Sequence, residues 1–403
     1  MDDHVQVRIH EVAYRGLGVG KLADGCVVFV PHCLPGELVT VEIVRRRRNF
    51  AEARLLTVVE AAPARIAPVC PLAGACPGCC YQHAAYAVEV ELKQRQLATL
   101  FQRLAGVAPS VCRPPAASPR ELGYRNKLVL HTAAGAPPAL GYFAYDNRTI
   151  LDVEACPLAA EPIQALLAGL RIDAAFVRSL PPQSRVTLRW TEHDGPMHWL
   201  CRAPPDPIRR SREHWLTERT ALGDLNVPRG SFFQVNPWAA DLLLARIKEH
   251  IDAIRPPSVI DLYCGAGVFA LAAARAGCAN VVGVDSDEAA ILAARRNAGR
   301  LGVGKAVRFL ARPAEVALAA AKAPDGPATL LVVDPPRDGL APGIVSEIGR
   351  RRFADVLYVS CAADTLARDI KRLSEHGYTI ASSQLVDMFP RTAYFESVTR
   401  LRR

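Results

Sequence analysis

Residues 4–60 alternate apolar and polar side chains in runs that are separated by glycine-rich turns. The runs are HVQVRIHEVA, GCVVFVP, ELVTVEIVRRRR and FAEARLLTVVE. A period of two is typical of strands that bury one face, and short strands at this spacing favour a small barrel. The pattern predicts a five-stranded β-barrel over residues 4–60. The basic run at residues 45–48 could follow a phosphate backbone, and a solvated loop is the alternative.

The next region, residues 61–225, mixes helical and strand patterns. Apolar residues near helical spacing predict a helix that starts at Tyr86 and ends at Gly106. A proline-rich linker at residues 113–119 leads to two strand-like segments, GYRNKLVLH and LGYFAYDNRTILDVEACPL, which are rich in basic and aromatic residues. Such strands suit stacking with unpaired bases, and an ordinary sheet edge is the alternative. We predict a central α+β domain that binds RNA.

Residues 226–403 alternate strand and helix patterns. A helix capped near Asn236 comes first, and helical patterns at 287–301, 342–352 and 363–376 then separate the strands VVGV, VRFLA, TLLVVD, VLYVSC and TIASSQLV. This alternation is typical of a doubly wound, mostly parallel sheet. The sequence therefore predicts a multidomain α/β protein whose C-terminal domain is Rossmann-like. A chain of 403 residues that is 50% hydrophobic can bury several cores.

A glycine turn stands at the start of this alternation, in VIDLYCGAGVFALAAARAGCANVVGVD at residues 259–285. Gly265 and Gly267 let the backbone pass close beneath a ligand where a Cβ would clash. Asp285 ends the second strand, where a carboxylate can accept both hydroxyls of an adenosine ribose. Because the glycine spacing departs from GxGxxG, S-adenosylmethionine is favoured over a dinucleotide. An ordinary crossover with a glycine turn is the alternative.

Two chemical groups are predicted at the carboxyl ends of later strands, where catalytic groups lie in such folds. They are Asp334 in DPPR and Cys361 in YVSC. Cys361 precedes a helix N-terminus, so the helix dipole is expected to lower its thiol pKa and favour the nucleophilic thiolate. A buried structural cysteine is the alternative.

Four cysteines are grouped around a loop rich in proline and glycine. Cys70, Cys76 and Cys79 are close in sequence, and Cys156 returns in VEACPL. Four thiolates can bind one soft metal centre, and the distant fourth ligand would join the loop to the next segment. Spacing alone leaves zinc and a 4Fe-4S cluster open. Cys79 is preferred to its neighbour Cys80 because it completes an x2 spacing with Cys76.

The net charge and the number of cysteines indicate which kind of partner the protein binds and in which compartment it works. The net charge of +9 and a sequence pI near 9.0 favour a polyanionic partner such as nucleic acid, with a basic but solvated surface as the alternative. Apolar runs are broken before they reach the roughly 20 residues of a membrane span, and MDDHVQVR has no signal-peptide pattern. Twelve cysteines then indicate a reducing compartment. We expect a cytoplasmic monomer.

Several strings occur together in a family-specific order. AYRGLGVGKL and VVFVPHCLPGELV stand near the N-terminus, followed by SFFQVNP, DLYCGAGVF, VVDPPRDGL, YVSCAADTLARDI and DMFPRTAYFESVTRLRR. With the four cysteines they resemble the RNA uracil-5-methyltransferases, closest to the 23S ribosomal RNA enzymes, over essentially the whole chain. The resemblance implies an OB-like, RNA-binding TRAM domain at residues 1–60, an iron-sulfur and RNA-binding region at 61–225 and a methyltransferase domain at 226–403.

The resemblance also implies roles for individual residues. The implied ligands of a 4Fe-4S cluster are Cys70, Cys76, Cys79 and Cys156. The implied contacts of S-adenosylmethionine are Gln234, Tyr263, Asp285 and Asp334. Cys361 would add to C6 of a uridine in 23S rRNA so that C5 can attack the sulfonium methyl group, and Glu396 would then remove the C5 proton. The target base is expected to flip out of any stack.

The chain departs from the family pattern beside both reacting groups. The family usually reads SCNP and His-Val-Glu there, and this chain has Ala362, Ala363, Tyr394 and Phe395. Three alternatives stay open: a transfer RNA enzyme, which the TRAM stretch and the cysteines disfavour; an enzyme that methylates an exocyclic amine, disfavoured by Arg337 in place of an aromatic residue; and a non-catalytic RNA-binding protein on the same scaffold.

Overall fold

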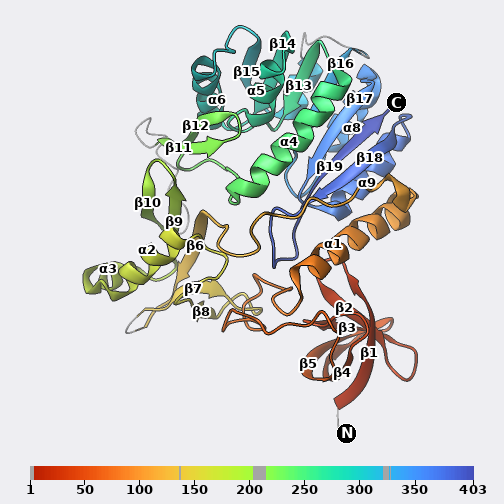
Figure 1. The fold of residues 1–403 in the computed structure, drawn as a ribbon, viewed down its shortest axis with the longest axis vertical. Coiled ribbons are helices and arrows are strands. Elements are labelled where there is room, and N and C mark those ends of the chain that lie inside the picture. The colour runs from red at the N-terminus through yellow and green to blue at the C-terminus, as the bar shows by residue number, and fades with distance from the viewer. Residues whose placement is uncertain (1–3, 136–137, 203–214, 321–325, 327) are drawn as a thin grey trace.

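The computed structural model describes residues 4–135, 138–202, 215–320, 326 and 328–403, so residues 203–214 of the predicted central region lie outside the described residues. Figure 1 shows three parts along the long axis of the molecule. A small barrel lies at one end, a larger sheet with helices lies at the other, and a second sheet lies beside them.

The N-terminal part is a closed five-stranded barrel in the order β1-β2-β3-β5-β4. Its strands are β1 (His4–Ala13), β2 (Leu17–Lys21), β3 (Val27–Pro31), β4 (Leu38–Arg46) and β5 (Phe50–Glu60). Every second residue points inward, which buries Val28 and Val30 on β3 and Val39 and Val41 on β4. The predicted barrel is confirmed.

Helix α1 (Tyr86–Leu100) continues as a π-helical turn (Phe101–Ala105) that ends at left-handed Gly106, as predicted. It packs on the C-terminal sheet, and Leu97 and Phe101 are fully buried there. Its face also buries Lys93, which forms ion pairs with Glu89 and with Asp387 of the C-terminal part. Because a buried charge requires a partner, this pairing fixes α1 to the C-terminal part.

The central part is an antiparallel sheet in the order β10-β9-β6-β7-β8, with two helices packed on it. Its elements are β6 (Lys127–Thr132), β7 (Leu140–Phe143), β8 (Ile150–Asp152), α2 (Glu161–Ile172), α3 (Ala174–Ser179), β9 (Ser184–Thr191) and β10 (Gly195–Arg202). The short hairpin of β11 (Trp215–Thr220) and β12 (Gly223–Pro228) follows.

The C-terminal part is a seven-stranded sheet in the order β15-β14-β13-β16-β17-β19-β18. Its strands are β13 (Ser258–Leu262), β14 (Asn280–Asp285), β15 (Val307–Ala311), β16 (Thr329–Val333), β17 (Asp355–Ser360), β18 (Thr379–Val386) and β19 (Glu396–Arg402). Its helices are α4 (Pro237–Ile254), α5 (Val268–Arg275), α6 (Glu288–Arg300), α7 (Ala314–Ala320), α8 (Pro342–Arg351) and α9 (Ala363–Ser374).

The first five strands of this sheet are parallel, and β19 runs antiparallel between β17 and β18. One hydrophobic core forms on each face of the sheet, and this explains why β13, β16 and β17 are buried at every position. The predicted Rossmann-like architecture is confirmed, and α7 is an element that the sequence pattern did not predict. The carboxyl ends of the parallel strands meet at one edge, where the candidate site lies.

Candidate active site

The glycine turn after β13 is held by the carboxylate of Asp285. One Asp285 oxygen accepts the backbone N–H of Gly265 at 2.8 Å, and the other accepts that of Asp287 at 2.8 Å. Gly267 has a φ of +88°, and a Cβ there would lie 2.8 Å from the Phe309 ring. The turn therefore needs glycine for both conformation and space, while Asp285 keeps free lone pairs for ribose hydroxyls.

Three of the four predicted cofactor contacts, Gln234, Tyr263 and Asp334, line one cavity beside this turn. Asp285 does not line it, but it binds the backbone of Gly265, which does. The side-chain oxygen of Gln234 is buried and accepts no hydrogen bond from the described residues. A buried acceptor without a partner fits a site that a polar ligand completes. The residues present thus fit a nucleoside cofactor.

Acidic groups are concentrated at this edge. Burial raises the pKa of Asp334 to about 7, and the neighbouring charge of Asp285 raises it further. Asp261, on β13, is fully buried, and its pKa is raised well above the usual range by burial and by Asp334 and Asp285. A cation bound here would relieve this repulsion. The site therefore favours a positively charged ligand such as a sulfonium.

Cys361 and Glu396 come together where two antiparallel strands end. Ser360, the last residue of β17, pairs with Ser397 of β19, so Cys361 and Glu396 stand next to this pair. Burial raises the thiol pKa of Cys361 to about 11, and the charges of Glu396 and Asp334 also raise it. The prediction of a lowered thiol pKa is therefore wrong for the ligand-free protein, because burial and two carboxylates outweigh the helix N-terminus.

The carboxyl group of Glu396 is buried, and one of its oxygens has no hydrogen-bond partner among the described residues. Burial raises its pKa well above the usual range, the charge of Asp334 raises it further, and Arg337 opposes the shift. A nearby bound cation would favour the carboxylate that a general base requires.

Arg337 is a functional candidate that the sequence did not reveal. Its positive charge lowers the thiol pKa of Cys361. Its guanidinium carbon lies 4.2 Å from the centre of the Tyr394 ring. The only sequence signal was its place three residues after Asp334, in DPPR. It is the cation that stabilises the thiolate among the carboxylates.

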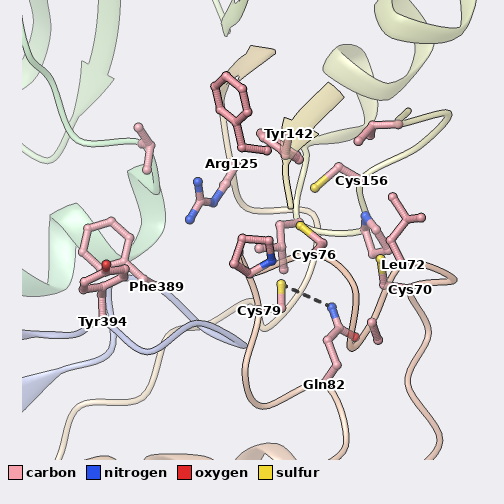
Figure 2. A pocket seen from close by; sticks show the side chains of 18 of the residues that line it. Cys70, Leu72, Cys76, Cys79, Gln82, Arg125, Tyr142, Cys156, Phe389 and Tyr394 are labelled. Carbon is pink, nitrogen blue, oxygen red and sulfur yellow. Dashed lines mark hydrogen bonds between the residues drawn. The ribbon is translucent and has the colours of Figure 1, made fainter. Parts of the chain in front are cut away.

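The four predicted ligand cysteines line a second cavity of about 540 Å³, which is within the usual size of ligand sites. Figure 2 shows Cys70, Cys76, Cys79 and Cys156 around this hollow, with Arg125 pointing between them and Tyr394. Cys80 does not line the cavity and packs against the barrel instead.

Burial raises the thiol pKa of Cys79 to about 12 and also raises those of Cys76 and Cys156, and the other cysteines of the group add to each shift. Metal ligation removes this penalty because the bound metal stabilises the thiolates. Arg125 supplies positive charge on the same cavity. Among the described residues, no group of three or more His, Cys, Asp or Glu side chains is arranged to hold a single metal ion.

The far end of the same cavity is lined by Gln234, Arg337 and Tyr394. Because the charge of Arg337 acts on Cys361, this end lies near the predicted nucleophile. Gln234 also lines the cofactor cavity, so the two cavities meet at this residue. Ligands bound in the two cavities would therefore meet beside Gln234.

The strand order, the glycine turn and the acidic nucleoside cavity define an S-adenosylmethionine-dependent methyltransferase. The family model described as tRNA (Uracil-5-)-methyltransferase matches residues 224–403, and the TRAM domain model matches residues 3–56. The chain belongs to the RNA (uracil-5-)-methyltransferase family, and the predicted resemblance is confirmed.

Two curated relatives match along the chain. The 23S rRNA (uracil(1939)-C(5))-methyltransferase of Alkalilimnicola ehrlichii is 32% identical over 99% of this chain and 96% of the relative. An uncharacterized RNA methyltransferase of Gloeobacter violaceus is 30% identical over 99% and 96%. Among solved structures, the tRNA (uracil-54, C5)-methyltransferase of Pyrococcus abyssi with S-adenosyl-L-homocysteine has a TM-score of 0.75 at 25% identity. It covers 98% of this chain and 100% of its own.

No helix among the described residues is long and apolar enough to cross a membrane.

Proposed function

We propose that this enzyme methylates C5 of a uridine in 23S ribosomal RNA through a covalent bond between Cys361 and C6 of the base. The observation that carries the proposal is the placement of Cys361 and Glu396 where β17 and β19 meet, with the positive charge of Arg337 acting on the thiol. A thiol, a carboxyl group and a cation are the three groups that this chemistry needs.

The first step uses the thiolate of Cys361. Arg337 favours loss of the thiol proton, and the sulfur then adds to C6 of the uracil. The new S–C6 bond pushes the electron pair of the C5–C6 double bond toward C5 and O4. C5 thereby becomes nucleophilic. Tyr394, held by Arg337, lines the cavity where the base would lie.

S-adenosylmethionine supplies an electrophilic methyl group when it is bound, and Gln234, Tyr263, Asp285 and Asp334 are the residues that would hold it. The carboxylates favour its cationic form over the neutral product, which promotes release of the product. Glu396 then removes the proton from C5, the S–C6 bond breaks, and the thiolate of Cys361 leaves as the double bond re-forms.

We also propose that Cys70, Cys76, Cys79 and Cys156 bind a 4Fe-4S cluster. The proposal is supported by their placement around one cavity, by the unfavourable burial of free thiols there and by the positive charge of Arg125. A cluster would fix the loop on one side of the cavity in which the target base would lie. No step of the methyl transfer requires it.

A transfer RNA substrate is the second candidate. The likeness to the Pyrococcus abyssi enzyme extends over 98% of this chain and therefore includes the barrel. The barrel consequently does not separate the two substrates. The 32% identity to the Alkalilimnicola ehrlichii enzyme favours ribosomal RNA.

The test is to map 5-methyluridine by mass spectrometry in 23S rRNA and in transfer RNA from cells with and without this protein. We expect one or more uridines of 23S rRNA to lose the C5 methyl group when the protein is absent. Loss confined to transfer RNA would establish the second candidate. A methyl group found on an exocyclic amine would contradict both.

A further inference from the structure

The turn between β1 and β2 of the barrel reaches the active site through Tyr14. The Tyr14 hydroxyl oxygen accepts the backbone N–H of Ala363 at 3.2 Å. The Tyr14 ring meets the ring of Phe395 edge-on, with 6.2 Å between the centroids. Ala363 follows Cys361 by two residues, and Phe395 directly precedes Glu396. One barrel side chain therefore contacts the neighbours of both reacting groups.

The N–H of Ala363 needs a partner because α9 begins there. The first N–H groups of a helix have no acceptor within the helix. Ala362 occupies the N-cap position and has no side chain that could accept a hydrogen bond. A proline at the first helical position would remove this N–H. This chain has Ala363 there, and the Tyr14 hydroxyl accepts the N–H instead.

The position of Tyr14 is fixed by its own turn. Arg15 and Gly16 both have positive φ angles, of 73° and 87°. A Cβ on Gly16 would lie 2.7 Å from the sulfur of Cys80, so the turn packs tightly against that side chain. Burial raises the pKa of Tyr14 to about 12, and the hydroxyl stays protonated at neutral pH. Arg15 and Asp364 form an ion pair at 3.5 Å, but because both side chains are exposed it contributes little to the stability of this contact.

We propose that Tyr14 is a positioning residue for methyl transfer: its hydroxyl completes the N-terminus of α9 and holds the backbone that carries Cys361. The proposal rests on the proposed role of Cys361 as the nucleophile. It assigns the barrel a part in organising the active site in addition to RNA binding. It also explains how the backbone N–H of Ala363 finds an acceptor, because that acceptor comes from another part of the chain.

The test is a double-mutant cycle that combines Tyr14→Phe with Ala363→Pro. Tyr14→Phe should lower the single-turnover rate of methyl transfer at saturating RNA by about three- to tenfold, because one hydrogen bond is lost. The dissociation constant for RNA should not change. Proline has no N–H for Tyr14 to accept, so in the Ala363→Pro background Tyr14→Phe should change the rate less than about twofold.

The matched control is Tyr378→Phe, which removes a buried hydroxyl that donates to the carbonyl oxygen of Phe353 at 2.9 Å. It should lower the melting temperature and leave the rate unchanged. Peptide mass spectrometry can follow the alkylation of Cys361 by iodoacetamide as a function of pH. The pH midpoint of this alkylation should shift in Tyr14→Phe and stay unchanged in the control.

An equal loss of rate from Tyr14→Phe in both backgrounds would overturn the proposal. Weaker RNA binding with an unchanged single-turnover rate would also overturn it, because the hydroxyl would then act on RNA. A wild-type enzyme that methylates no uridine would instead contradict the proposed function itself, and the alkylation profile of Cys361 would still test the contact.

Discussion

Cys361 and Glu396 stand next to the Ser360–Ser397 pair, at the end where β17 and β19 meet. The antiparallel direction of β19 explains this placement, because β19 begins at the end of the sheet where β17 finishes. The proposed nucleophile and the proposed general base, 35 residues apart in sequence, are therefore brought to the same end of the two strands.

The charges around Cys361 predict opposite effects for two substitutions. Glu396→Gln removes a carboxyl group that raises the thiol pKa, and Arg337→Gln removes the cation that lowers it. The pH midpoint for alkylation of Cys361 by iodoacetamide should fall in the first variant and rise in the second, from about 11 in the wild type. Peptide mass spectrometry measures it. Shifts of the same sign would show that the local charges do not control the thiol.

The raised pKa of Asp334 predicts that cofactor affinity depends on pH. Its pKa of about 7 means that the group is protonated below that pH and charged above it. A sulfonium binds the charged form better, so the affinity for S-adenosylmethionine should rise as the pH increases through that pKa. Calorimetry should show a smaller dependence for neutral S-adenosylhomocysteine. Asp334→Asn should give the two ligands the same pH dependence of affinity. If the two pH dependences still differ as in the wild type, Asp334 does not control cofactor binding in this way.

Two glycines of the cofactor turn should differ in their tolerance of alanine. Both have positive φ angles, but a Cβ on Gly267 would lie 2.8 Å from Phe309, and one on Gly265 would meet no atom within 4 Å. Gly267→Ala should therefore lower the free energy of unfolding by about 1–3 kcal/mol more than Gly265→Ala. Urea denaturation followed by circular dichroism measures this. Adding Phe309→Leu should recover part of the loss, and equal effects at the two glycines would refute the steric argument.

The cysteines that line the cavity are the ones we expect to bind iron. Anaerobically purified protein should be brown and contain about four irons per chain. Cys79→Ser should lose iron because Cys79 lines the cavity. Cys80→Ser is the matched control, since Cys80 packs against Gly16 of the barrel and should leave the iron content unchanged. A colourless, zinc-loaded protein with full activity, or iron loss in Cys80→Ser, would contradict the proposed ligand set.

The local patterns of the sequence predicted much of this architecture. Alternation in the barrel, and strand and helix spacing after residue 226, depend on neighbours in sequence, and both were confirmed. The glycine turn was equally accessible because its geometry depends on Gly265 and Gly267. Helix α1 was predicted from its apolar positions, but its buried Lys93 was not, since the partner Asp387 comes from the other end of the chain.

The same reason explains what the sequence did not reveal in the site. Arg337 acts on Cys361 from another strand end, and Tyr14 reaches Ala363 from the barrel. Neither contact has a signature in sequence spacing. The thiol pKa was predicted with the wrong sign because the helix N-terminus is a local feature, whereas the opposing carboxylates come from β16 and β19.

The proposed covalent bond between Cys361 and C6 of the uracil can be tested directly by trapping it. Glu396→Gln cannot remove the C5 proton, so with RNA and S-adenosylmethionine it should hold methylated RNA on Cys361 as an adduct that survives denaturing electrophoresis. Wild-type enzyme with 5-fluorouridine at the target should be trapped likewise, since fluorine cannot leave as a proton. Cys361→Ala should bind both ligands and form no adduct. Methyl transfer by Cys361→Ala, or the absence of a Cys361-dependent adduct in both traps, would contradict the mechanism.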